Sequence, residues 1–95
     1  IARAETVGRE MPIAFLDENG TVVEKRLDRI IRENGIDTVI DYKSGEATPA
    51  RLERDREQVA LYCRAYERLS GRPCRGALWY IDEGNDVTIE VQTTP

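Results

Sequence analysis

Asp41 and Lys43 place a carboxylate and an ammonium group two residues apart, where they could take part in chemistry together. They follow the β-branched run at residues 38–40 and precede Ser44-Gly45, which predicts a buried strand and its exit. Alternate side chains of a strand point to the same face, so the carboxylate and the ammonium are expected side by side. This pair suits a metal ligand beside a charge-stabilising lysine. The alternative is a surface ion pair, which contributes little to stability.

Asp28 is a second acid in an unusual place, because it lies between Leu27 and the Ile30-Ile31 pair in a predicted strand. A carboxylate there is costly to bury without a partner. Arg26 or Arg29 could supply that partner, and so could a metal ion. If the two strands form one hairpin, Asp28 and Asp41 converge, and two carboxylates with a backbone carbonyl and waters suit Mg²⁺.

The chain that positions these residues divides into five predicted strands and one helix. Residues 1–9 carry little pattern and are expected to be a lead-in or the tail of a helix. Asn-Gly turns at 19–20 and 34–35 predict an antiparallel meander, with a bend near Asp28, and a further turn is expected at 82–86. The order β-β-β-α-β-β predicts an α/β (α+β-like) fold with a mixed central sheet; its elements are expected at residues 10–17, 21–31, 38–45, 50–69, 75–81 and 87–91.

The predicted helix begins after Thr48 as N-cap, with Pro49 in its first turn. Its apolar stripe is expected to pack on the sheet and consists of Leu52, Val59, Cys63 and Tyr66. Gln58 and Tyr62, four residues apart, flank this stripe and face the same way. They are either ordinary helix-edge polarity, with the tyrosine hydroxyl reaching solvent, or part of the site.

Composition limits the function classes. Ninety-five residues make one domain, and the missing initiator methionine suggests a piece cut from a longer protein. A net charge of −4 argues against binding nucleic acid by phosphate neutralisation alone, and the lack of histidine excludes histidine-based catalysis. Two distant cysteines, Cys63 and Cys74, predict buried thiols in a reducing cytosol rather than a zinc site. No apolar run is long enough to span a membrane.

Three motifs in order resemble the RecB-type nuclease domain of the PD-(D/E)XK superfamily, found at the end of UvrD-like helicases of the RecBCD and AddAB type. They are Asp28 in Arg-Leu-Asp-Arg-Ile, Asp41-Tyr42-Lys43 in Val-Ile-Asp-Tyr-Lys-Ser-Gly, and Gln58-Val-Ala-Leu-Tyr62. The similarity runs from about residue 9 to residue 80. It implies a restriction-endonuclease-like core that lacks its first helix.

The resemblance also implies roles for these residues. Asp28, Asp41 and the carbonyl of Tyr42 would bind Mg²⁺ or Mn²⁺, and Lys43 would position water and stabilise charge on the phosphate. Gln58 and Tyr62 would support the site and touch DNA. The implied activity is exonuclease V-like DNA hydrolysis within an ATP-dependent helicase–nuclease that processes double-strand breaks. Its implied partners are DNA, the rest of the helicase chain and a second subunit, in a bacterial-type, nucleoid-associated cytoplasmic setting.

The sequence departs from the family in two ways. The metal-binding histidine of the family, carried on an upstream helix, has no counterpart, and Lys25 stands where a small residue is common. The isolated piece is therefore expected to be a weak nuclease or an inactive one. One alternative is a catalytically degenerate copy that serves as a DNA-binding or inter-domain scaffold. Another is a small interaction module whose acids are only solvated surface.

Overall fold

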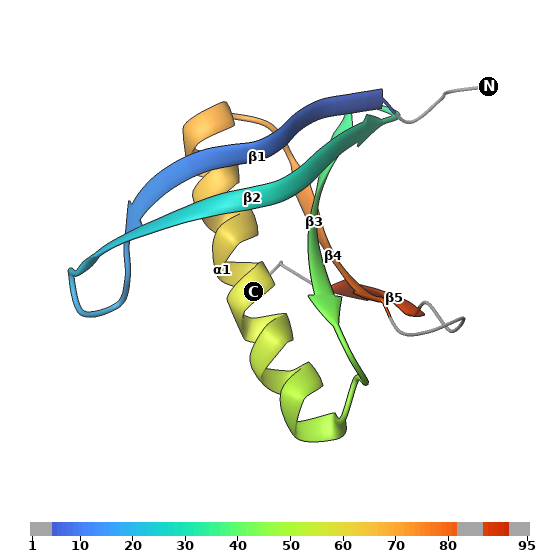
Figure 1. Ribbon diagram of the computed structural model, residues 1–95. Helices are drawn as coiled ribbons and strands as arrows, with labels where there is room; N and C mark the ends of the chain where they lie inside the picture. The colour runs from blue at the N-terminus through green and yellow to red at the C-terminus, as the bar shows by residue number, and fades with distance from the viewer. Residues whose placement is uncertain (1–4, 82–86, 92–95) are drawn as a thin grey trace.

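A five-stranded mixed sheet with one long helix packed on it forms the described part of the chain (Figure 1). The computed structural model describes residues 5–81 and 87–91. The elements, in chain order, are β1 (Glu5–Leu16), β2 (Val22–Glu33), β3 (Ile36–Ser44), α1 (Pro49–Ser70), β4 (Cys74–Ile81) and β5 (Val87–Val91). This is the β-β-β-α-β-β order that the sequence predicts.

The sheet order is β1-β2-β3-β4-β5, so every strand lies next to its neighbours in the chain. The pairs β1–β2, β2–β3 and β4–β5 are antiparallel, whereas β3 and β4 are parallel. A parallel pair needs a crossover connection, and α1 provides it. The predicted mixed sheet and α/β fold class are therefore confirmed.

Local sequence signals fix the ends of these elements. Asn34 and Gly35 take positive φ angles of 54° and 77° in the tight turn between β2 and β3. Thr48 caps α1, because its side chain accepts a hydrogen bond from the Arg51 backbone N–H. Gly71 ends the helix in the left-handed conformation and donates its N–H to Glu67.

The first strand differs from the prediction. It begins at Glu5 rather than at residue 10, and its first residues pair with β2 in the register Glu5↔Arg32 and Thr6↔Ile31. The expected lead-in is thus wrong for residues 5–9, because the β2 ladder supplies order that a short polar sequence does not reveal. Residues 1–4 and the expected turn at 82–86 lie outside the described residues.

The bend expected near Asp28 corresponds to irregularities on β1 and β2. The register of β1 shifts between Thr6 and Gly8, and Glu10, nearer to Asp28, has a φ of 48°. On β2, Leu27 and Ile30 both lie in the core although they are three residues apart. The two-residue alternation of buried side chains on β2 therefore shifts between Leu27 and Ile30, in the part of the strand that contains Asp28.

The core lies between α1 and the sheet. Val59, Cys63 and Tyr66 are buried there as predicted, and Leu52 packs against them partly buried. Gly76 on β4 permits this close packing, since a Cβ at that position would lie 2.6 Å from a Val59 methyl group. Cys63 and Cys74 are buried and form no disulfide. Among the described residues, no helix combines the length and apolar character needed to cross a bilayer.

Candidate active site

The candidate site forms where β2 and β3 separate. The last paired residues of this ladder are Arg29 and Ile40, so the next position places Asp28 opposite Asp41 and on the same face. Asp28 Oδ2 accepts a hydrogen bond of 2.8 Å from the Tyr42 backbone N–H. A side chain thus holds the backbone of β3 at the point where the strand ladder ends.

Arginine does not neutralise Asp28. The guanidinium of Arg29 binds the Thr6 hydroxyl instead, through Nε at 3.2 Å and Nη2 at 2.9 Å. Within residues 5–81 and 87–91, Asp28 forms no ion pair. The arginine pairing that the sequence left open is therefore absent from the described structure.

Asp41 is 3% exposed, so its pairing with Lys43 is buried rather than a surface contact. Lys43 Nζ lies 3.1 Å from Asp41 Oδ2, within ion-pair distance. The geometry is not that of a hydrogen bond, and Asp41 Oδ2 is a buried oxygen that lacks a hydrogen-bond donor. Such an oxygen is costly in a protein interior and is an available ligand for a cation.

The electrostatic environment of Asp41 reflects this arrangement. Burial raises the pKa of Asp41, and the neighbouring Asp28 carboxyl group raises it further. Lys43 and then Lys25 lower this pKa. Two carboxyl groups in mutual contact resist double ionisation unless positive charge is added. A cation bound beside the two acids would therefore stabilise their ionised forms.

Helix α1 brings Gln58 and Tyr62 to the same place. Lys43 Nζ donates a hydrogen bond of 3.3 Å to Gln58 Oε1, although Gln58 is exposed overall. Tyr62 is 4% exposed and belongs to the core. Its pKa is raised first by burial and then by the charge of Asp41. Gln58 therefore contacts Lys43 and Tyr62 is buried, so neither is a helix-edge group directed only at solvent.

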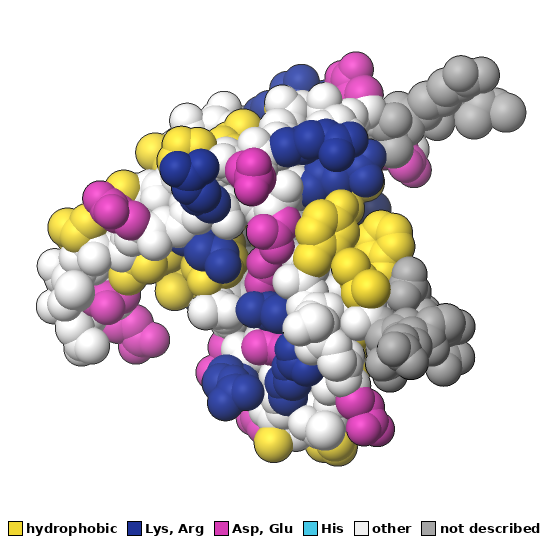
Figure 2. Space-filling view, viewed as in Figure 1, with side chains coloured by type: hydrophobic (Ala, Val, Ile, Leu, Met, Phe, Trp, Pro, Cys, Tyr) yellow, Lys and Arg dark blue, Asp and Glu magenta, His cyan; other side chains and the backbone are white. Residues whose placement is uncertain are grey.

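The donor set suits a hard divalent cation. No cluster of three or more His, Cys, Asp or Glu side chains occurs in the described part of the chain. Mg²⁺ prefers one or two carboxylates and keeps several waters, which suits Asp28 and Asp41, whose Oδ2 has an ion pair with Lys43 but no hydrogen bond. Figure 2 shows acidic side chains at the centre of this face, with Lys and Arg side chains on either side.

The comparisons with known proteins identify the superfamily and the fold. The family model described as PD-(D/E)XK nuclease superfamily matches residues 2–94. The chain belongs to this superfamily. Among solved structures, the crystal structure of SSO0001 is similar at 24% identity and a TM-score of 0.68, which shows a shared fold. The match covers 97% of this chain and 43% of that one, so the chain spans less than half of that solved protein. No curated protein matches the chain.

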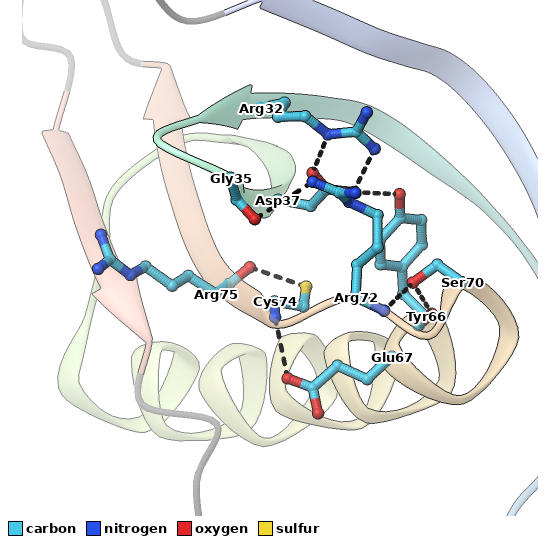
Figure 3. Close-up of polar contacts among 9 residues, drawn as sticks. All are labelled: Arg32, Gly35, Asp37, Tyr66, Glu67, Ser70, Arg72, Cys74 and Arg75. Atoms are coloured by element: carbon cyan, nitrogen blue, oxygen red, sulfur yellow. Dashed lines mark hydrogen bonds and ion pairs between the residues drawn. The ribbon is translucent and has the colours of Figure 1, made fainter. Parts of the chain in front are cut away.

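In this nuclease-superfamily domain, a buried network fixes the start of β3 (Figure 3). Asp37 is fully buried, and Arg32 of β2 binds both of its oxygens, at 2.6 and 3.1 Å. Tyr66 of α1 donates a 2.6 Å hydrogen bond to Asp37, and Arg72 Nε lies 3.3 Å away. These contacts lower the pKa of Asp37 to about 2, with the Arg32 hydrogen bond as the largest cause. The network ties β2, α1 and β3 together.

A second buried contact fixes the start of α1. Tyr80 of β4 donates a hydrogen bond of 2.8 Å to Asp55, which also lies 3.5 Å from Arg51 Nε. Tyr80 is the register partner of Lys43, so this contact supports the strand beside the site. Burial and the Asp55 hydrogen bond raise the pKa of Tyr80 to about 12, which keeps the hydroxyl a donor at neutral pH.

The sequence motifs led to the acids, Lys43 and the helix pair, but not to every group that acts at the site. Asp37 carries no motif, and its role depends on partners that are distant in sequence. Lys25 stands out in the sequence only as a departure from the family pattern, yet its charge lowers the pKa of Asp41. The signal that could have drawn attention to Lys25 is that the chain contains only two lysines.

Proposed function

We propose that this domain is a metal-dependent DNA nuclease that hydrolyses phosphodiester bonds. Membership of the nuclease superfamily supports the reaction class. The single observation that carries the proposal is the buried Asp41 Oδ2, which faces Lys43 and Asp28 yet receives no hydrogen bond. A purely structural acid would be expected to have its oxygens satisfied, as Asp37 has.

Asp28 and Asp41 would hold Mg²⁺ or Mn²⁺, with the Tyr42 carbonyl as a third protein ligand. When bound, the ion polarises phosphate oxygens and makes its water more acidic. Asp28 also fixes the backbone of Tyr42 through its 2.8 Å hydrogen bond, which orients that peptide relative to the acids. This hydrogen bond would help to position the proposed metal ligands before an ion binds.

Lys43 would place positive charge beside the scissile phosphate, where negative charge develops in the transition state. The ammonium group of Lys43 donates a 3.3 Å hydrogen bond to Gln58 and lies 3.1 Å from the Asp41 carboxylate. Tyr62 is a buried side chain of the same helix and, with Gln58, would contact DNA. A lysine held on two sides needs little reorganisation when substrate arrives.

The same proposal extends to the protein that carries the domain. The order and spacing of the Asp28, Asp41–Lys43 and Gln58–Tyr62 motifs favour a RecB-like exonuclease at the end of an ATP-dependent helicase. Such a protein would act on DNA ends in double-strand-break repair, in the cytoplasm beside the nucleoid, with a second helicase or nuclease subunit as partner. The acidic domain has a net charge of −4, so flanking segments would supply most of the DNA affinity.

The test measures cleavage of linear DNA by the full-length protein with Mg²⁺ or Mn²⁺ at matched salt. Asp41→Ala should abolish cleavage and leave DNA unwinding unchanged, because it removes a metal ligand rather than the motor. Glu53→Ala is the matched control, since Glu53 is an exposed acid on the solvent side of α1. The isolated 95-residue domain should cut weakly or not at all. Cleavage by Asp41→Ala at the unmodified rate would instead support a scaffold role.

A further inference from the structure

Lys25 is one of the two lysines in the chain; the other, Lys43, lies at the candidate site on a different strand. Lys25 is half-buried on β2, opposite Ile13 of β1, on the side of the hairpin that faces α1. Its Nζ lies 5.4 Å from the centre of the Tyr62 ring. Lys25 is therefore held over a side chain that lies one helical turn from Gln58, the acceptor for Lys43.

The Tyr62 ring is itself fixed. It is 4% exposed, and Phe15 packs against it edge-on, with ring centres 6.1 Å apart and planes at 68°. A cation over such a ring is attracted by its negative face. This contact uses the charge of the ammonium group but not its N–H donors, so Lys25 keeps donors for another acceptor.

The partners of the two lysines differ. Lys43 is engaged by Asp41 and by Gln58. Lys25, by contrast, forms no ion pair and no hydrogen bond to a side chain among the described residues. Lys25 nevertheless lies close to Lys43, because its partner Tyr62 is one helical turn from Gln58, which accepts a hydrogen bond from Lys43. Lys25 is thus a pre-positioned cation whose donors are not committed.

We propose that Lys25 binds a non-bridging phosphate oxygen of the nucleic-acid backbone next to the scissile bond, with the Tyr62 ring holding it in place. This inference rests on the proposed nuclease function and extends it to a specific substrate contact. The ligand class is a phosphodiester backbone, read without regard to base sequence, because an ammonium group recognises phosphate as a point charge. In an acidic domain, one uncommitted lysine beside the acids offsets their repulsion of the substrate.

The competing interpretation is that Lys25 only covers Tyr62 with its aliphatic stem. The two interpretations differ in what they predict for charge. Lys25→Met keeps the length and apolar character of the stem and removes the charge, whereas Lys25→Arg keeps both the charge and the contact with the ring. Arg54→Met is the matched control, because Arg54 is exposed on the solvent face of α1.

The first measurement is steady-state cleavage of linear duplex DNA by the full-length protein over a range of salt concentrations. Lys25→Met should raise KM about tenfold and leave kcat within about twofold, because a contact made equally in ground and transition states changes KM. The slope of log(kcat/KM) against log[salt] should fall in magnitude by about 0.9, the effect of one phosphate contact. Lys25→Arg and Arg54→Met should retain the unmodified slope. An unchanged KM and slope in Lys25→Met would overturn the proposal.

The second measurement needs no variant and decides the matter if Lys25→Met fails to fold. An amine-reactive reagent labels lysines of the unmodified full-length protein, with EDTA present so that DNA is not cut, and mass spectrometry follows the peptides that contain Lys25 and Lys43. Duplex DNA should protect both. If Lys43 is protected and Lys25 reacts equally with and without DNA, the Lys25 proposal fails alone. If neither is protected, or if Asp41→Ala still cuts, the proposed function fails with it.

Discussion

The Asp28 carboxylate accepts a hydrogen bond from the Tyr42 backbone N–H at 2.8 Å, across the point where β2 leaves β3. One acid therefore does two things: it faces Asp41, and it holds the peptide that follows Asp41. The contact replaces the ladder hydrogen bond that a continuing β2–β3 pair would have made. Geometry and charge at this position can be separated by substitution.

Asp28→Asn should separate them. The asparagine oxygen can still accept the Tyr42 N–H, so the melting temperature should stay within about 2 °C of the unmodified protein. Cleavage should fall about 100-fold or more, because the amide is a poor replacement for a carboxylate metal ligand. Asp28→Ala should lose both activity and stability. Rates on linear DNA with Mg²⁺ and thermal unfolding measure the two effects, and full activity in Asp28→Asn would exclude Asp28 as a ligand.

Lys43 and Gln58 should affect the chemical step rather than metal affinity. Lys43→Ala should reduce kcat by about 10²–10³-fold, the usual cost of losing one transition-state donor. Gln58→Ala should cost less, about tenfold, because it only releases the lysine. Mn²⁺ titration by calorimetry should give nearly unchanged affinity for both variants. A large loss of Mn²⁺ affinity in Lys43→Ala would assign the lysine a role in building the metal site instead.

Asp41→Asn should stabilise the metal-free protein by roughly 0.5–2 kcal/mol, because it removes a buried charge that the fold does not fully satisfy. The pKa of Asp41 is raised, so its charge costs nothing below the ordinary carboxyl range and costs most above the raised value. The gain should therefore be small near pH 3.5 and larger at pH 7. Urea unfolding in EDTA measures the change in unfolding free energy, with Glu53→Gln as the control. An Asp41→Asn variant that is less stable at neutral pH would contradict a net cost of the buried Asp41 charge.

Asp37 should behave in the opposite way. Its pKa is lowered from 3.8 to about 2, so its ionised form contributes stability above pH 4 and loses it as pH falls toward 2. A shift of this size corresponds to roughly 2 kcal/mol. Asp37→Asn should thus be less stable by about that amount at pH 6, and the difference should shrink as the pH approaches 2. Equal stability of the two proteins at pH 6 would show that the network contributes nothing net.

Local sequence signals predict much of the fold. The Asn34-Gly35 turn, the Thr48 cap and the apolar stripe of the helix each act over a few residues, so each can be predicted without knowing the rest of the structure. The start of β1 could not be predicted in this way. Residues 5–9 are extended because they pair with the far end of β2, a contact between residues more than twenty positions apart.

The site likewise has some contacts that local sequence predicts and others that depend on residues distant in the chain. The spacing of Asp41 and Lys43 places them together through the period of a strand, and their 3.1 Å contact follows from it. The contact of Lys25 with Tyr62 joins a strand and a helix that are separated by 37 positions in the chain, and no local pattern encodes it. The burial of Asp37 likewise depends on two arginines and a tyrosine from other elements.

β3 carries Asp37 and Asp41 on one face, about 13 Å apart along the strand at four residues of rise. Both oxygens of Asp37 accept hydrogen bonds, whereas Asp41 Oδ2 forms an ion pair with Lys43 and accepts none. Laboratory evolution could therefore search substitutions around Asp41 for new metal preference or altered cleavage while Asp37 keeps the domain folded. Stability and the proposed activity would then depend on different positions of the same strand, Asp37 and Asp41.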